Sequence, residues 1–534
     1  MPRFKPYDMR QNLLLPINLA EQLVPGSFEY TLNYLVDHEI DTTIFHDHYH
    51  NDETGRLAYD PAMLLKVVLF AYSRGITSSR RIEKSCRENV VFMALSADSQ
   101  PHFTTIADFI SRMHKPVGQL FIQVLMICDQ LGLIGKDMFA IDGRKMSSNA
   151  SKEWSGTHNE LKGKKKKLEK AISRLLKRHR EQDTHEQMNP QHQKEDAQRI
   201  ETLKQASRRI KTFLQEQPER TNKRNQPLKG NVTDPDSAKM KTAKGVIQGY
   251  CGVAAVDSRH QVIMHGEAYG HGAEQSTLIP MVKAIDAQCR WLGHSDIFKT
   301  ARITADSGFH SRENLEALAR LNVDAYIADN QYRQRDPDFD QAGRYRVQHK
   351  KERAALAKQR GKSVATGRFT TRDFKFDTRT MTCTCPAGKP MWLSSAKAMI
   401  GGQPAYQFCG YVHHCRDCPL KAQCLRRSDQ KRPRSVAFFY QKVVDQQRPD
   451  VLQIMKDKID SPAGKRVYSK RLAVAEPPFA HMQAMGLSEL TLRGRPKVNG
   501  QWLLMCALHN LKKIHGYGGE KLQQRIQKVM KQTL

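Results

Sequence analysis

The sequence lacks a long apolar segment. Even the apolar stretch at 64–70 is interrupted by Lys66, and no run of about 18 or more apolar residues occurs, which is the length that a membrane-spanning helix needs. The N-terminus also lacks the apolar core of a signal peptide. We therefore expect a cytoplasmic protein that has no membrane partner.

The sequence is also short of acidic residues. Its 55 Asp and Glu residues stand against 86 Lys and Arg residues, which leaves a formal net charge of +31 at pH 7. Such an excess of positive charge favours a polyanionic partner, because binding to phosphates releases their condensed counterions. A chain of 534 residues is long enough for about two to four domains. Nucleic acid is therefore the first candidate partner, and the size suits an enzyme.

The cysteines lack the even number and regular spacing of a disulfide framework. There are 11 of them, and they are unevenly spaced. The spacing of four suits thiolate coordination of a structural Zn²⁺ ion; these are Cys385, Cys415, Cys418 and Cys424. The alternative is a set of reduced, partly buried thiols in a small β-rich insertion.

The region at 1–135 has mostly helical apolar spacing and is expected to form a helical N-terminal domain. One helix opens with Pro61 and ends on Gly75, which are helix start and stop signals. The next helix carries Arg80 and Arg81, so that this part of the chain resembles a helix-turn-helix DNA-binding motif. The alternative for the two arginines is ordinary solvated surface on a helical bundle.

A strongly basic segment follows at about 158–230. Two apolar stripes at helical spacing, separated by an Asn-Pro break, predict a helical hairpin. Lysines crowd its first helix, and Lys164, Lys165 and Lys166 are candidate contacts for DNA phosphates. A solvated charged face is the alternative.

Strands and helices alternate around two aspartates, which predicts an α/β domain with a mixed sheet. Residues 138–142 and 303–305 are expected to be strands, with Asp142 and Asp306 where these strands end. Open α/β sheets place their chemistry at the carboxyl ends of strands. The alternative for each aspartate is a turn, since Asp-Gly and Asp-Ser-Gly are both turn signals. No partner strand follows Asp142 closely, so we expect Gly143 to let the chain bend away from the strand.

Five blocks of the sequence occur in the order typical of one family. They are YDPAMLLKVVLFAYSRGITSSRRIE at 59–83, AIDGRKMSSNAS at 140–151, TDPDSAKMKT with GYCGVAAVD between 233 and 257, ITADSGFHSRENLEAL at 303–318, and a last block with Tyr468, Arg471, Glu476, Phe479 and TLRGRPKVNGQWLLMCALHNL. With these blocks the chain resembles the DDE transposases of bacterial insertion sequences, in particular the branch numbered IS-eleven-eighty-two. The resemblance covers nearly the whole chain.

The resemblance implies a ribonuclease-H-like catalytic core. In it, Asp142, Asp306 and Glu476 are the catalytic residues, and they bind a pair of divalent cations, Mg²⁺ or Mn²⁺. Tyr468 and Arg471 match the family's tyrosine-arginine pair and would hold a DNA phosphate, for which the forked guanidinium group is well suited.

The implied partner is double-stranded DNA, at the ends of the element and at the target. Two ends must be brought together, so we expect a dimer or higher oligomer on DNA. A bacterial enzyme of this kind would be associated with the nucleoid when it is bound to DNA. Lys145, which closely follows the first aspartate, is a further candidate for the DNA path.

Two features near Glu476 depart from the family or constrain the geometry. The family usually has Gly and Lys four and seven residues after the glutamate, where this chain has Ala480 and Gln483. A lysine there would meet a phosphate, so glutamine puts the strength of that contact in question. Pro477 and Pro478 follow Glu476, and proline suits a first helical turn while it restricts the residue before it. Glu476 is therefore expected at or just before a helix N-terminus, where the helix dipole favours its ionised form.

The expected fold is thus multi-domain α/β. The expected parts are a helical DNA-binding domain at 1–135, the first part of the catalytic core at 136–325 with the basic helical-hairpin insertion, a Cys-rich insertion at 326–445, the final part of the core at 446–515 and a basic tail at 516–534. The expected function is metal-dependent DNA cleavage at insertion-sequence ends and strand transfer into target DNA. The alternatives are a catalytically decayed DNA-binding repressor of a mobile element, and a ribonuclease-H-like nuclease without joining activity.

Overall fold

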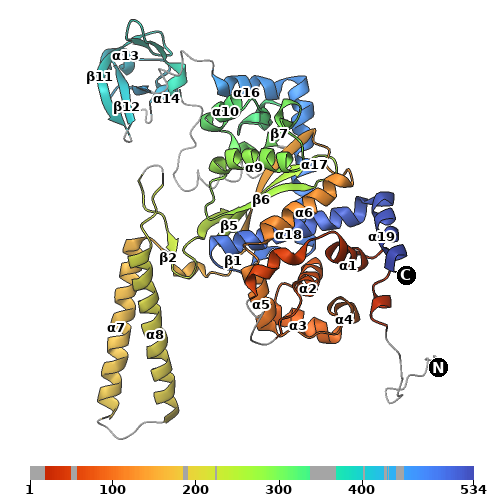
Figure 1. The fold of residues 1–534 in the computed structure, drawn as a ribbon. Coiled ribbons are helices and arrows are strands. Elements are labelled where there is room, and N and C mark those ends of the chain that lie inside the picture. Colours follow the sequence, from red (N-terminus) through yellow and green to blue (C-terminus); the bar gives the residue numbers. More distant parts are fainter. Residues whose placement is uncertain are drawn as a thin grey trace, which may run out of the picture. The chain divides into compact units, whose positions relative to one another are not determined.

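The structure is a computed structural model of the 534-residue chain (Figure 1). It describes residues 18–49, 57–183, 190–222, 225–243, 245–336, 369–400, 403–425, 430, 432–440 and 450–533. The chain forms two compact units, of which unit 1 comprises 1–327 with 465–534 and unit 2 comprises 328–464. None of the described helices is both long enough and apolar enough to span a membrane.

Six α-helices lie in the described residues of the first part of unit 1. Their bounds are α1 Phe28–His38, α2 Pro61–Ser73, α3 Ser79–Glu88, α4 Val90–Ser96, α5 Phe103–Arg112 and α6 Val117–Gln130. The start of α2 follows from its sequence, because Asp60 accepts a hydrogen bond from the Ala62 amide and Pro61 takes the first helical position. Helices α1, α2, α5 and α6 contact α18 (Arg495–Tyr517), which joins these helices to the sheet.

A mixed sheet forms the centre of unit 1. Its strands are β1 Met138–Ser148, β4 Ala238–Thr242, β5 Gly245–Asp257, β6 Ile263–Tyr269, β7 Arg302–Ala305, β8 Asp324–Ile327 and β14 Glu489–Leu490. The order is β4-β5-β1-β7-β8, with β6 paired to β5 and β14 paired to β1. The β1, β7 and β8 strands run parallel, and β5 runs antiparallel to β1. The predicted α/β class with a mixed sheet is confirmed.

Helix α18 packs against this sheet through close backbone approaches. Trp502 is fully buried, and its indole Nε1 donates a hydrogen bond to the carbonyl of Val253 at 3.1 Å. A Cβ atom at Gly252 or Gly266 would lie 3.0 to 3.1 Å from the Trp502 ring, so these glycines leave room for the indole. Asn510 adds a second link, because its side chain bonds both the amide and the carbonyl of Ile263.

The course of β1 corrects one expectation. The strand does not end at Asp142 but continues to Ser148, since β5 pairs with it from Phe139 through Ser147. Gly143 is therefore part of a strand rather than a bend. A Cβ atom at Gly143 would lie 3.1 Å from the Cys251 sulfur, which is the packing reason for a glycine. Asp306, in contrast, directly follows the end of β7, as predicted.

The course of α17 (Pro462–Ala484) corrects a second expectation. The helix runs through Pro477 and Pro478, so Glu476 lies inside a helix and not at its N-terminus. Pro477 cannot donate to the carbonyl of Ala473, four residues earlier. The side chain of Gln261 donates to that carbonyl instead, at 3.1 Å, so that the freed acceptor is satisfied by a tertiary contact.

The remaining helices of unit 1 are α7 His158–Asp183, α8 Pro190–Glu216, α9 Leu278–Trp291, α10 Arg312–Arg320 and α19 Gly519–Thr533. Helices α7 and α8 pack side by side (Figure 1), in the region where a helical hairpin was expected. Leu161, Ile210 and Phe213 form a small buried cluster at its base, next to the short strands β2 (Ser155–Gly156) and β3 (Gly230–Asn231).

Unit 2 contains a five-stranded antiparallel sheet of order β13-β12-β11-β10-β9. Its strands are β9 Lys375–Asp377, β10 Thr382–Thr384, β11 Pro390–Ile400, β12 Gln403–Gly410 and β13 Ser435–Phe439, and its helices are α11 Tyr332–Arg335, α13 Val412–Arg416, α14 Lys421–Cys424 and α16 Val451–Asp460. Its core cluster has five buried residues, Phe374, Cys383, Met391, Phe408 and Val436. Residues 337–368, where the polar part of the insertion was expected, lie outside the described residues.

Candidate active site and cysteine cavity

Two aspartates and one arginine meet at the end of β7. Arg471 Nη1 donates to Asp142 Oδ2 at 3.2 Å, and Arg471 Nη2 lies 3.5 Å from Asp306 Oδ1. Arg471 is only 6% exposed, whereas the Asp142 and Asp306 side chains are 21% and 44% exposed. A buried cation thus joins two carboxylates that open toward solvent.

The sheet explains why the two aspartates are neighbours. Strands β1 and β7 run parallel with Ile141 opposite Ala305, so the next residue of each chain segment is an aspartate at the same level. Asp142 also accepts a hydrogen bond from the Gly143 amide at 2.8 Å, which fixes one of its oxygens. The pairing of β1 with β7 thus brings together two aspartates that are far apart in the sequence.

The electrostatics of Asp142 are those of a crowded anionic site. Burial raises the pKa of Asp142 above its ordinary value, the Gly143 amide and Arg471 oppose this shift, and Asp306 adds to it. A positive charge placed between the carboxylates would relieve both burial and repulsion. In this structure Arg471 supplies that charge.

A third carboxylate near the pair was missed by the sequence analysis. Glu274 begins the short helix η4 (Glu274–Thr277), and a Cβ atom at Gly308 would lie 2.6 Å from its Oε2 atom. Burial raises the pKa of Glu274, Lys145 lowers it, and both aspartates raise it further. Lys145, expected on the DNA path, therefore lies close to this glutamate. A lone Glu before a helix gave no signal that could have singled it out.

Glu476 is placed differently from the two aspartates. It is exposed, and among the described residues no hydrogen bond or ion pair joins it to Asp142 or Asp306. It lies on α17, the same helix as Arg471. The structure therefore brings two members of the expected triad together and leaves the third nearby in sequence on the helix that carries their arginine.

Arg144 joins β1 to the C-terminal half of α17. Arg144 donates to the Phe479 carbonyl and to Gln483 Oε1, each at 3.1 Å. Gln483 lies seven residues after Glu476, which is about 20° of rotation around the helix. Arg144 and Asp142 are two residues apart on β1 and thus share one face of the strand. Gln483, on the stripe of α17 that carries Glu476, therefore contacts β1 through Arg144, whereas Arg471 of the same helix contacts Asp142 itself.

Tyr468 lies one helical turn before Arg471, and the arginine's guanidinium carbon is 5.8 Å from the centre of the tyrosine ring. The two residues that were expected to hold a phosphate are thus neighbours. In this structure the guanidinium group of Arg471 instead contacts Asp142 and Asp306.

The other candidate DNA contacts are surface residues that differ in how far neighbouring groups already bind their charged ends. Arg80 stacks over the Phe103 ring at 4.6 Å, and Arg81 is exposed. Lys164 is half-buried, since it donates to the Glu153 carbonyl at 2.8 Å and lies 4.2 Å from the Trp154 ring. Lys165 pairs with Glu169 at 3.0 Å, whereas Lys166 is exposed.

The TDPDS motif has a structural role that the sequence analysis did not identify. Buried Asp234 accepts hydrogen bonds from the Tyr250 hydroxyl and from the Gly494 amide. Asp236 accepts from the Arg495 amide at 2.8 Å. Both carboxylates thereby hold the N-terminus of α18, where free amides and the helix dipole favour anions.

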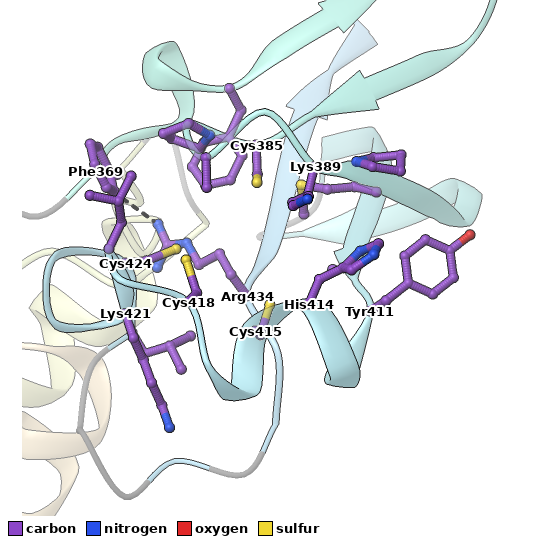
Figure 2. Close-up of a pocket in the computed structure, with 18 residues that line it drawn as sticks. Phe369, Cys385, Lys389, Tyr411, His414, Cys415, Cys418, Lys421, Cys424 and Arg434 are labelled. Carbon is purple, nitrogen blue, oxygen red and sulfur yellow. Dashed lines mark hydrogen bonds between the residues drawn. The ribbon is translucent and has the colours of Figure 1, made fainter.

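The four cysteines expected at a zinc site line one cavity in unit 2. Figure 2 shows Cys385, Cys415, Cys418 and Cys424 around this space, together with Arg434. Within the described part of the chain, no three or more His, Cys, Asp or Glu side chains are arranged closely enough to hold a metal ion. The cysteines are therefore gathered in one place without forming a preformed coordination shell.

Comparison with known families gives two matches. Residues 384–515 match the family described as "Transposase DDE domain", and residues 18–112 match the family described as "Transposase domain (DUF772)". The first match includes Arg471, Glu476 and the four cavity cysteines, and the second includes Arg80 and Arg81. No curated protein matches the chain, and no solved structure does.

Proposed function

The chain belongs to the DDE transposases of insertion sequences, and we propose that it cuts DNA at the ends of such an element and joins the freed ends to target DNA. The observation that carries this proposal is the pair Asp142 and Asp306, which leave adjacent parallel strands and are joined by buried Arg471. We place this pair in a ribonuclease-H-like core, and Glu476 is its third acidic member.

The side chains at this site suit a hard divalent cation. Carboxylate oxygens are the ligands that Mg²⁺ and Mn²⁺ prefer, and Asp142 and Asp306 already bind one positive group between them. Asp142, Asp306 and Glu476 would hold the ions, with Glu274 flanking them. When bound, such ions polarise the scissile phosphate and activate the attacking oxygen.

The residues of the chain have separate tasks in this proposal. In the absence of DNA, Arg471 neutralises the negative charge of the two aspartates. When DNA binds, Arg471 and the neighbouring Tyr468 bind a phosphate, because the guanidinium group can donate paired hydrogen bonds to either anion. Glu476 faces open solvent, so a DNA backbone can approach it without displacing core packing.

A cationic path for DNA flanks this point. Arg144 donates to the Phe479 carbonyl and to Gln483. Its positive charge is therefore next to position 483, where the family usually has a lysine. Lys145 is on the neighbouring position of β1. Exposed Arg81 and Lys166 are candidates for contacts farther along the duplex, where each phosphate contact adds salt-dependent affinity. The active assembly is a dimer or higher oligomer on DNA.

The test is incubation of the full chain with duplexes that carry the element's ends, with and without Mg²⁺ or Mn²⁺. The proposal expects nicking and joining that need the metal, and a loss of both in Asp142→Asn and Asp306→Asn. Asp296→Asn is the matched control, since Asp296 is exposed and its carboxylate pairs with nearby Lys299. Binding without nicking would instead identify a repressor, and nicking without joining would identify a nuclease.

A further inference from the structure

The cysteines of unit 2 fall into two groups. Cys383 is 1% exposed, belongs to the small hydrophobic core and contacts the Met391 sulfur at 3.9 Å. Cys409 lies on β12 opposite Trp392 and does not line the cavity. The other four cysteines line the cavity, and Figure 2 shows their sulfur atoms directed into the space between the segments that carry them. Four thiols thus line one cavity, and two of them, Cys385 and Cys424, also pack against the core cluster that contains Cys383.

Three separate segments supply these four thiols. Cys385 lies in a tight turn between β10 and β11, in which its amide donates to Lys389 and its carbonyl accepts from Gly388, whose φ is +74°. Cys415 lies in α13, and Cys424 ends α14, with Cys418 between the two helices. Neither helix exceeds five residues, so tertiary interactions are needed to stabilise them.

Arg434 points to an anionic occupant of the cavity. Its Nη2 atom donates to the Phe369 carbonyl at 3.3 Å, but its buried Nε atom has no hydrogen-bond partner among the residues that the structure describes. An unsatisfied buried donor on a charged group is costly. A divalent cation held by four thiolates carries net negative charge, and this would compensate the guanidinium group.

Among its described residues, unit 2 has a small core cluster of five buried residues. Small folds often depend on a metal or on disulfides for stability. The cysteines are free thiols in this structure, so they are available to a metal ion.

We propose that Cys385, Cys415, Cys418 and Cys424 bind one structural zinc ion, with Arg434 against the thiolates. Binding releases the thiol protons to solvent and requires the sulfurs to move to about 2.3 Å from the metal. His414 also lines the cavity, but its ring packs edge-on against Tyr411 with the ring centroids 5.6 Å apart, and we assign the four ligand positions to the thiolates. The inference concerns unit 2 alone and stands whether or not the chain transposes DNA.

The first test is the metal content of the full chain, purified without added chelator. We expect about one zinc ion per chain. After replacement by Co²⁺, we expect the intense visible absorption of tetrahedral thiolate coordination. A chain that is folded and holds no zinc, or a cobalt spectrum without thiolate character, would overturn the proposal.

The second test assigns the ligands. Cys418→Ser and Cys424→Ser should each lose most of the zinc, whereas Cys409→Ser and His414→Ala should retain it. Limited proteolysis of the unsubstituted full chain tests the same site without any variant. Zinc removal by a chelator should speed cleavage within 369–440, and added Zn²⁺ should restore protection. Equal zinc loss in Cys409→Ser, or loss in His414→Ala, would contradict the assigned ligand set.

Discussion

Replacement of Arg471 by alanine should destabilise the protein in a way that divalent cations reverse. The substitution removes the only cation within hydrogen-bonding reach of Asp142 among the described residues, and it leaves two neighbouring carboxylates without compensation. Because Mg²⁺ or Mn²⁺ can take the place of the guanidinium group, the variant should depend on these ions for stability more than the wild type does.

The size of the effect follows from burial. Removal of one partner from a fully buried ion pair costs about 3–5 kcal/mol, whereas an exposed pair contributes about 0–1 kcal/mol. Arg471 is 6% exposed, but the Asp306 side chain is 44% exposed and its interaction is screened by solvent. We therefore expect a loss of about 2–3 kcal/mol in the free energy of unfolding, which lies between these limits.

The assay is urea unfolding of Arg471→Ala with and without Mg²⁺. Lys470→Ala is the matched control, since it removes the same charge from an exposed neighbouring position. The double variant Arg471→Ala with Asp142→Asn should lose less than the sum of the two single losses, because the uncompensated charge is gone. If Arg471→Ala behaves as Lys470→Ala does, or if Mg²⁺ stabilises both equally, the assigned charge balance is wrong.

Three further outcomes are expected. Glu476→Gln should lower metal-dependent nicking by at least about 100-fold, as expected for a metal ligand, while Glu274→Gln should stay within a few-fold of wild type; the reverse ranking would make Glu274 the third ligand. Burial lowers the pKa of His509 from 6.5 to about 3, so this neutral residue contributes stability that is complete above pH 6.5 and is lost as the pH falls from 6.5 toward 3, by up to about 1.4 kcal/mol per pH unit. Urea midpoints measured across this range should fall less steeply in His509→Gln, and parallel curves would refute the assignment. Lys166→Ala should weaken DNA binding uniformly across sequences and reduce its salt slope by about one, measured by fluorescence anisotropy, whereas an unchanged slope would remove Lys166 from the DNA path.

The sequence predicted the features that depend on local pattern. Helical spacing predicted α7 and α8, and a strand followed by Asp306 was found where expected. The four cysteines chosen for their spacing are those that line one cavity. Periodicity and residue spacing are properties of short segments. They can therefore be interpreted without knowing which distant segments pack against them.

The features that depend on distant neighbours could not be predicted. Gly143 was expected to bend the chain, but pairing along the length of β5 keeps it in a strand. Pro477 was expected to start a helix, but Gln261 satisfies the carbonyl that this proline leaves free. Glu274 reaches the aspartates only through the packing of η4 against Gly308. In each case a tertiary contact outweighs a local preference.

The central claim is that Asp142 binds a catalytic metal ion, and a change of metal preference tests it most directly. The measurement is the nicking rate of Asp142→Cys on DNA that carries the element's ends, in Mg²⁺ and in Mn²⁺, beside the wild type. Mg²⁺ binds thiolate poorly, and Mn²⁺ accepts sulfur more readily than Mg²⁺ does, so we expect almost no nicking in Mg²⁺ and partial recovery in Mn²⁺. A nicking rate in Mg²⁺ equal to that of the wild type would show that Asp142 is not a metal ligand.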